Sequence, residues 1–333
     1  MLKHGGALRA AADRYEIALA DWLDLSTGIN PLGWSVPAVP AAVWRRLPEL
    51  NDGLERVAAH YYGNDQLLPV AGSQAVIQAL PMLRGLSKVG VLQPGYAEHA
   101  YAWRRHGHSV QLLSAQTLLT AVDSLDVVVV INPNNPTGAR LPAATLLDWR
   151  AQLETRGGWL VVDEAFMDST PQESIATHAG LPGLIVLRSL GKFFGLAGVR
   201  VGFALAETEL RRRLEEQLGP WTVNGPGRWV ASQALTDRVW QCQMRASLSQ
   251  ASARLAELLS RHGLIVAGGT ALFQWVLHPQ AEILQDALAR QGILVRRFDE
   301  PPSLRLGLPD TESAWQRLAL ALVEIHAEQP APN

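Results

Sequence analysis

The pattern of hydrophobic and polar residues divides the chain into short apolar runs and helix-like segments. Runs of β-branched and other apolar residues stand at 89–92, 127–131, 159–162 and 184–187, and runs of this length predict buried strands. Segments with helical periodicity alternate with such runs from about residue 50 to 230, as they do in βαβ units. The pattern therefore predicts an α/β domain with a mainly parallel sheet flanked by helices.

The two ends of the chain differ from this central pattern. Residues 1–40 are rich in glycine and proline, which predicts little regular structure. A long helical pattern at 229–262 leads into strand-like runs at 272–277, 293–295 and 304–306 and a helix at 312–327. We therefore expect an amino-terminal segment (1–40), a large domain (41–230) and a small α+β domain (231–333).

Composition narrows the range of partners. The 333 residues carry a net charge of −2 and 48% are hydrophobic, so there is no basic excess for nucleic acid. No apolar run reaches the length of a membrane span, and the start lacks the apolar stretch of a signal peptide. A single cysteine, Cys242, cannot form an internal disulfide, and no metal-ligand spacing stands out. These features predict a cytoplasmic protein with no metal, nucleic-acid or membrane partner.

The segment from Arg188 to Arg200 carries the clearest chemistry. It places Lys192 in a glycine-rich, mostly apolar loop, with Ser189 three residues before it and Arg200 eight after it. An apolar wall disfavours the ammonium form of lysine, so its amine becomes nucleophilic and condenses with an aldehyde. A hydroxyl and a guanidinium suit a phosphate on the same molecule. The pattern points to pyridoxal phosphate (PLP), and the alternative is a solvated surface lysine.

Two further segments suit the same cofactor. Asp163 ends the apolar run 159–163, and Asn135 lies in the Asn-Pro-Asn-Asn-Pro-Thr-Gly turn that follows the run 127–131. Ligands bind at the carboxyl ends of strands in open parallel sheets. There Asp163 can pair with a protonated pyridine nitrogen, and Asn135 can hydrogen-bond the phenolic oxygen of the ring. Taken singly, the turn can be an ordinary loop and Asp163 a helix cap, but their order and spacing favour one cofactor site.

Together these motifs resemble the fold-type I PLP enzymes of the aspartate aminotransferase superfamily, on the branch that includes histidinol-phosphate aminotransferase. A closer resemblance is to the L-threonine-O-3-phosphate decarboxylases of cobalamin biosynthesis. It covers the chain from its start to about residue 230 and is looser beyond, at 303–306. The segments that carry the closer resemblance are His4-Gly5-Gly6, 24–33, 94–98, 163–168, 188–200 and 220–224.

The resemblance implies further cofactor ligands and a two-fold assembly. It places Tyr96 on the face of the pyridine ring and the backbone of Gly72, Ser73 and Gln74 on the phosphate. The alternatives are a packing tyrosine and an ordinary helix cap. It also implies that the amino-terminal segment packs with the small domain and that the chain forms a homodimer.

For the substrate, a phosphorylated amino acid, we expect two groups of ligands, of which the resemblance itself implies Arg305 as the carboxylate-binding arginine. Arg305, which stands in an apolar strand, and Asn30 would orient the carboxylate. His4, Gly5 and Gly6 would bind the phosphate. The alternatives are a structural ion pair for Arg305 and a disordered terminus for His4.

Three positions depart from the wider superfamily pattern. Phe166 stands where most relatives have a tyrosine that bonds the ring oxygen, and the decarboxylase branch shares this phenylalanine. Gly191 replaces the Ser or Thr before the lysine, and Leu47 replaces a tyrosine that reaches the neighbouring subunit. The last two departures remove phosphate contacts. Two alternatives follow: the affinity for the cofactor is lower than in relatives, or Tyr61 or Tyr62 replaces the lost contacts.

The expected reaction is decarboxylation of L-threonine O-3-phosphate to (R)-1-amino-2-propanol O-2-phosphate. The alternative enzyme is a histidinol-phosphate-type aminotransferase, which shares the cofactor site. The His-Gly-Gly start and Phe166 favour the decarboxylase. A third possibility, a PLP-fold regulator, would need a DNA-binding domain ahead of motifs that already begin at His4.

Overall fold

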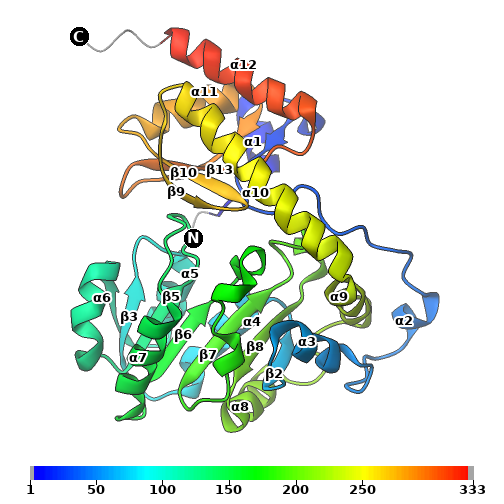
Figure 1. Cartoon of the computed structure of the whole chain (residues 1–333), viewed down its shortest axis with the longest axis vertical. Helices are drawn as coiled ribbons and strands as arrows, with labels where there is room; N and C mark the ends of the chain where they lie inside the picture. The colour runs from blue at the N-terminus through cyan, green and yellow to red at the C-terminus, as the bar shows by residue number, and fades with distance from the viewer. Residues whose placement is uncertain (1–3, 329–333) are drawn as a thin grey trace. The chain divides into compact units, whose positions relative to one another are not determined.

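The computed structural model describes residues 4–328 and divides into two compact units (Figure 1). The larger unit holds Gly33–Asn135 and Ala139–Gln243. The smaller unit holds the chain up to Leu32, the short stretch Pro136–Gly138 and the chain from Met244 onward. The amino-terminal segment thus shares a unit with the carboxyl-terminal third. This division differs from the expected boundaries, because residues 33–40 and 231–243 belong to the larger unit.

The larger unit is built on a seven-stranded sheet with strand order β2-β8-β7-β6-β5-β3-β4. The pairs from β7 through β4 are parallel, whereas β8 runs antiparallel to both of its neighbours. The prediction of a mainly parallel sheet is confirmed. The strands are β2 (Leu67–Val70), β3 (Lys88–Leu92), β4 (Ser109–Leu113), β5 (Val127–Ile131), β6 (Trp159–Asp163), β7 (Leu184–Ser189) and β8 (Gly202–Ala206).

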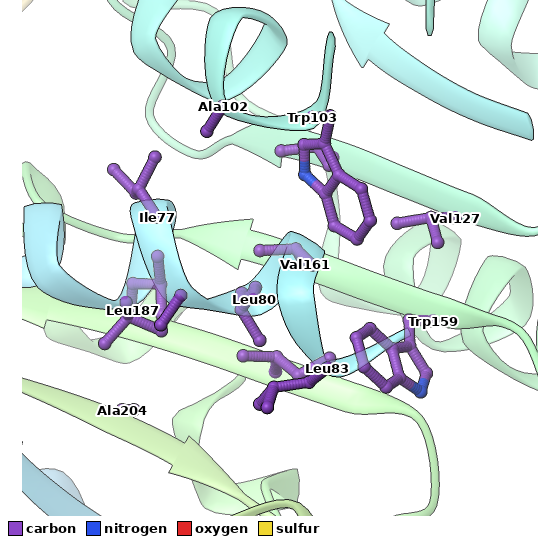
Figure 2. Close-up of a cluster of buried hydrophobic side chains, with 14 of the residues drawn as sticks. Ile77, Leu80, Leu83, Ala102, Trp103, Val127, Trp159, Val161, Leu187 and Ala204 are labelled. Carbon is purple, nitrogen blue, oxygen red and sulfur yellow. The ribbon is translucent and has the colours of Figure 1, made fainter. Parts of the chain in front are cut away.

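Helices pack against this sheet and bury its central strands. Every residue of β5, β6 and β8 is buried, which is why these strands read as continuous apolar runs. On one face, side chains of α4 and α5 such as Ile77 and Trp103 pack with Val161 and Leu187 (Figure 2). The helices are α2 (Ala41–Arg45), α3 (Leu54–Tyr62), α4 (Ser73–Ala79), α5 (Ala97–Arg105), α6 (Ala115–Ala121), α7 (Ala143–Glu154), α8 (Thr208–Leu218) and α9 (Gly225–Thr236).

The smaller unit is an α+β structure, as predicted. Its four-stranded antiparallel sheet has the order β12-β13-β10-β9, and β1 (Leu23–Asp24) pairs in parallel with β11 (Ile293–Leu294). Its other elements are α1 (Leu8–Tyr15), β9 (Ile265–Thr270), β10 (Phe273–Leu277), α11 (Ala281–Arg290), β12 (Arg296–Phe298), β13 (Ser303–Gly307) and α12 (Glu312–Glu328). Within residues 4–328, no helix is long and apolar enough to cross a membrane.

Two local features differ in detail from the predictions. The amino-terminal segment contains a regular helix, α1, because Ala11 packs with Trp22 and with Ala289 of α11 in a small core. The helical pattern at 229–262 is two helices, α9 and α10 (Arg238–Arg261), separated at Asp237. The side chain of Asp237 accepts hydrogen bonds from Trp240 N at 3.0 Å and from Trp34 Nε1 at 3.0 Å, which holds this break in place.

Candidate active site

One cavity in the larger unit brings together all nine residues predicted to bind the cofactor. The cavity has a volume of about 160 Å³ and lies where β5, β6 and β7 end and α4 and α5 begin. Ligands are expected at this edge of an open α/β sheet. The nine residues are Gly72, Ser73, Gln74, Tyr96, Asn135, Asp163, Ser189, Lys192 and Arg200, and Phe166 and Gly191 also line the cavity. Their individual roles remain predictions.

Asp163 has a partner that the sequence analysis missed. Its Oδ2 lies 2.9 Å from Nε2 of His99, and its Oδ1 accepts a hydrogen bond from Ala165 N at 3.0 Å. Both side chains are buried, with 1% of His99 exposed. A carboxylate held by two hydrogen bonds has a fixed orientation. The signal for His99 was its place in the first turn of α5, three residues after Tyr96, which is the N-cap of this helix.

Gly72 and Arg200 form a close pair at the rim of the cavity. Gly72 has φ +74°, and a Cβ added to it would lie 2.8 Å from Nη2 of Arg200. Arg200 itself has φ 58°, a left-handed conformation that is uncommon outside glycine. Backbone strain of this kind gathers at ligand sites. With the N–H groups of Ser73 and Gln74 and the Ser189 hydroxyl, Arg200 supplies donors of the type that bind a phosphate.

Gln74 links the rim of the cavity to Tyr96. The Gln74 amide donates to Glu98 Oε2 at 2.8 Å, and the Tyr96 hydroxyl donates to Gln74 Oε1 at 3.3 Å. Burial, with the nearby charges of Glu98 and Asp163, raises the pKa of Tyr96 to about 12. Tyr96 is therefore a neutral phenol at physiological pH, and it lines the cavity.

Lys192 lies beside the two residues that depart from the superfamily pattern. Its Nζ lies 5.3 Å from the centre of the Phe166 ring, within the range of a cation–π contact. Gly191 N donates to Ser189 Oγ at 3.2 Å. A Cβ added to Gly191 would lie 3.3 Å from Cα of Ala197, so a larger residue would crowd this turn.

The two tyrosines considered as replacement phosphate ligands point elsewhere in this chain. Tyr61 donates to Asp168 Oδ1 at 3.1 Å, and Tyr62 packs edge-on against Phe203. Neither lines the cavity of their own chain. Leu47 is exposed on the surface of the larger unit.

In the smaller unit, Arg305 faces a second arginine. Arg305 on β13 is the antiparallel partner of Arg296 on β12, a residue that the sequence analysis missed. Arg305 is buried, and its Nη2 donates to the carbonyl of Ser26 at 2.6 Å. Burial and the neighbouring Arg296 lower the pKa of Arg305 to about 10, against the opposing effect of Asp24. Like charges at facing positions are unfavourable, and a bound carboxylate or phosphate would stabilise them.

Ser26 also holds the His-Gly-Gly segment. Gly6 N donates to Ser26 Oγ at 2.8 Å, and a Cβ added to Gly5 would lie 2.4 Å from the Ser26 carbonyl oxygen. His4, Gly5 and Gly6 line a second cavity, of about 810 Å³, which they share with Ser26 and Arg296. Thus the structure connects this segment to Arg305 through one serine.

The fourth predicted substrate ligand, Asn30, is buried in the smaller unit. Its Oδ1 accepts a hydrogen bond from Leu32 N at 2.9 Å, which forms a local turn. Asn30 and Arg305 do not line the cavity that holds His4.

Comparison with known proteins places this geometry in a family. The model of the aminotransferase class I and II family matches residues 21–322. The chain belongs to this family. Among relatives in it, the threonine-phosphate decarboxylase of Pseudomonas aeruginosa is 60% identical over 323 residues, which cover 97% of this chain and 98% of that protein. The threonine-phosphate decarboxylase of a Sinorhizobium species is 44% identical over 329 residues, covering 97% and 98%.

The class I and II aminotransferase fold is also seen in solved structures. The histidinol-phosphate aminotransferase of Sinorhizobium meliloti, crystallised with pyridoxal-5'-phosphate, aligns with a TM-score of 0.83 over 98% of each chain. At 19% identity this likeness concerns the fold. The predicted fold type and the resemblance to this family and to the threonine-phosphate decarboxylases are confirmed.

Proposed function

We propose that this chain is a PLP-dependent threonine-phosphate decarboxylase. It converts L-threonine O-3-phosphate to (R)-1-amino-2-propanol O-2-phosphate and carbon dioxide in cobalamin biosynthesis. The observation that carries the proposal is the likeness to threonine-phosphate decarboxylases over 97% of the chain, together with one cavity lined by all nine expected cofactor ligands. The exposed thiol of Cys242 suits the reducing cytoplasm, where we place the enzyme.

The residues that line the cavity fit PLP. An aldehyde needs an amine, which Lys192 provides, and a phosphate needs the donors of Ser73, Ser189 and Arg200. A Cβ at Gly72 would enter the space of the Arg200 guanidinium, so the glycine keeps this rim open. When bound, PLP supplies an electron-accepting ring that weakens the bonds to Cα of the attached amino acid.

Asp163 and Lys192 have separate tasks in this site. The Asp163 carboxylate, fixed by His99 and Ala165 N, would hold a proton on the ring nitrogen and so strengthen the ring as an electron acceptor. Lys192 would hold the cofactor, and either Lys192 or a water would deliver a proton to Cα after carbon dioxide leaves. The centre of the Phe166 ring lies 5.3 Å from Lys192 Nζ, and Phe166 adds no hydroxyl to the site.

The two anionic groups of the substrate suit the arginines of the smaller unit. Arg305 and Arg296 face each other across β13 and β12 and would be stabilised by a carboxylate or phosphate. Ser26 contacts both Arg305 and the His-Gly-Gly segment, so this segment adds backbone N–H donors near Arg305. Which bond at Cα breaks depends on how these groups orient the carboxylate, and we assign Arg305 and Asn30 to that task and His4, Gly5 and Gly6 to the phosphate.

Carbon dioxide release without an amino acceptor tests the reaction. PLP-loaded protein is incubated with L-threonine O-3-phosphate in the absence of any keto acid, and carbon dioxide is measured. Release at a rate that depends on the substrate supports the decarboxylase. If the protein releases none and instead converts histidinol phosphate in the presence of 2-oxoglutarate, the aminotransferase is the correct assignment.

The proposal includes a homodimer. Apolar side chains are exposed along residues 36–50 of the larger unit, including Val36, Trp44, Leu47 and Leu50. Exposed apolar side chains concentrated in one segment mark an interaction surface, and a second copy of the chain suits it. Light scattering should give a molar mass twice that of the chain, and the variant Trp44→Glu should give the mass of a single chain. An active wild-type monomer would contradict the dimer.

A further inference from the structure

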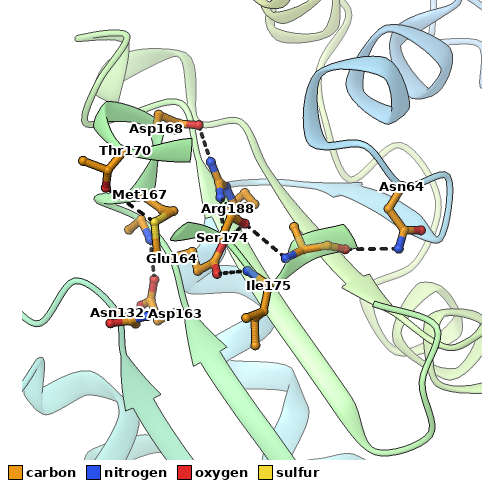
Figure 3. A network of polar contacts seen from close by, with 12 residues as sticks. Asn64, Asn132, Asp163, Glu164, Met167, Asp168, Thr170, Ser174, Ile175 and Arg188 are labelled. Atoms are coloured by element: carbon orange, nitrogen blue, oxygen red, sulfur yellow. Dashed lines mark hydrogen bonds and ion pairs between the residues drawn. The ribbon is translucent and has the colours of Figure 1, made fainter. Parts of the chain in front are cut away.

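A buried ion network lies next to the cofactor cavity and takes no part in lining it. Arg188 Nη1 donates to Glu164 Oε2 at 2.6 Å, and Nη2 donates to Asp168 Oδ1 (Figure 3). All three residues are at most 1% exposed. Burial alone would lower the pKa of Arg188, but Asp168 and Glu164 outweigh it and raise the pKa above its ordinary value. The arginine is therefore charged.

The network directly adjoins two predicted cofactor ligands in sequence. Glu164 follows Asp163 at the end of β6, and Arg188 precedes Ser189 at the end of β7. Asp163 pairs in register with Leu187, and Glu164 N donates to Leu187 O at 2.9 Å. Because side chains alternate along a strand, Asp163 and Ser189 point to one face of the sheet, and Arg188 points to the other. The Arg188–Glu164 ion pair thus joins the ends of β7 and β6 on the sheet face opposite to Asp163 and Ser189.

Other hydrogen bonds fix the network itself. Glu164 accepts from Ser174 Oγ at 2.5 Å and from Ile175 N at 2.9 Å, and Tyr61 donates to Asp168. The guanidinium carbon of Arg188 lies 4.8 Å from the centre of the Tyr62 ring. A network with so many fixed partners has little freedom to shift.

Stability alone does not account for a buried ion network. Taking charges out of water is costly, and apolar residues of similar volume are often as stable or more stable in such positions. What the network adds is geometry, because it fixes the spacing between the ends of β6 and β7. A small displacement of groups that hold a reacting ligand reduces binding and rate.

We propose that Arg188, Glu164 and Asp168 are positioning residues that fix the distance between the Asp163 carboxylate and the Ser189 hydroxyl. The inference rests on the proposed function, in which these two groups hold opposite ends of PLP. The network then determines how tightly the apo protein binds the cofactor, separately from how stably it folds.

The test separates cofactor affinity from folding. In the triple variant Glu164→Gln, Asp168→Asn, Arg188→Met, all three charges are removed and none is left buried alone. We expect the apo form to melt within a few degrees of wild type, while the Kd for PLP, measured by absorbance titration, rises at least tenfold. Leu118→Ala is the control, because Leu118 is fully buried on α6 and outside the cavity. It should lower the melting temperature and leave the Kd within twofold.

A second variant covers the case in which the triple variant does not fold. Arg188→Lys keeps the charge but cannot donate to both carboxylates in the same fork, so it should raise the Kd for PLP at least threefold. Wild-type affinity in every folded variant would overturn the positioning role. If wild-type protein itself fails to bind PLP, the proposed function is wrong, and the two failures are thereby distinguished.

Discussion

The contact between His99 and Asp163 gives a prediction that can be worked through from the structure. In the variant His99→Leu, the Asp163 carboxylate keeps the hydrogen bond from Ala165 N and loses its contact at 2.9 Å with the imidazole. A buried hydrogen bond to a charged group contributes about 1.5–3 kcal/mol. If this contribution acts through the ring nitrogen in the transition state, kcat/KM should fall roughly 10- to 150-fold.

The assay compares this variant with a matched histidine. His108 is also buried and also forms one hydrogen bond, to the Pro81 carbonyl at 2.9 Å, but it does not line the cavity. Carbon dioxide release from L-threonine O-3-phosphate and thermal unfolding are measured for both leucine variants. We expect similar losses of stability and a loss of kcat/KM in His99→Leu alone. Equal rates in the two variants, or a loss below threefold in His99→Leu, would refute the reasoning.

Three further predictions address other parts of the molecule. Lys192→Ala should abolish both turnover and the PLP label that borohydride fixes to the wild-type protein, and a peptide map that finds the label on Lys88 would contradict the assignment. Arg305→Ala should raise KM for threonine phosphate at least tenfold while leaving the PLP absorbance unchanged; an unchanged KM would remove Arg305 from the substrate site. Burial would raise the pKa of Asp52, but hydrogen bonds from Arg228 and from Leu54 N lower it below 3.8. The Asp52–Arg228 pair therefore stabilises the fold above pH 3.8, and this stabilisation is lost as the pH falls through the lowered pKa of Asp52. In wild type the melting temperature should fall between pH 5 and pH 2, and this fall should be smaller in Arg228→Met. The same pH profile in both proteins would show that the pair does not cause the fall.

Much of the larger unit could be predicted because its strands and cofactor ligands are marked by patterns of neighbouring residues in the sequence. β5 and β6 are buried along their whole length, so each is an apolar run; β6 ends at Asp163, and β5 is followed by Asn132. The carboxyl ends of parallel strands share one edge of the sheet. For this reason Asn135, Asp163 and Lys192 could be brought together from the order of three segments alone.

Elements that depend on distant partners were harder to predict. The helix α1 forms in a glycine-rich region because Ala11 packs against Ala289, which lies far away in the sequence. The break between α9 and α10 depends on a hydrogen bond between Asp237 and Trp34. Neither contact leaves a periodic signal in the residues around it, so pattern analysis favoured a coil in the first case and one continuous helix in the second.

The functional side chains that were missed share a physical property. His99 contacts Asp163, and Arg296 pairs with Arg305 across two strands, so each acts on another residue of the protein. A motif identifies residues by the chemistry that a ligand needs, and it carries no information about what supports them. These supporting residues are found from which strands pair and which helix lies beside a strand end, and both are known only from the three-dimensional structure.

The choice between decarboxylation and transamination depends on residues of this less predictable kind. Both reactions use the same amine, carboxylate and phosphate donors, so the nine residues of the cofactor cavity do not distinguish them. The bond that breaks at Cα is the one held perpendicular to the ring, and the groups that bind the substrate's carboxylate and phosphate decide which one that is. In this chain the candidates are Arg305, its partner Arg296 and the Gly6 segment held by Ser26. Experiments on reaction type therefore have to vary the anionic groups of the substrate and the residues that bind them, because changes at Asp163 or Ser189 would impair both reactions alike.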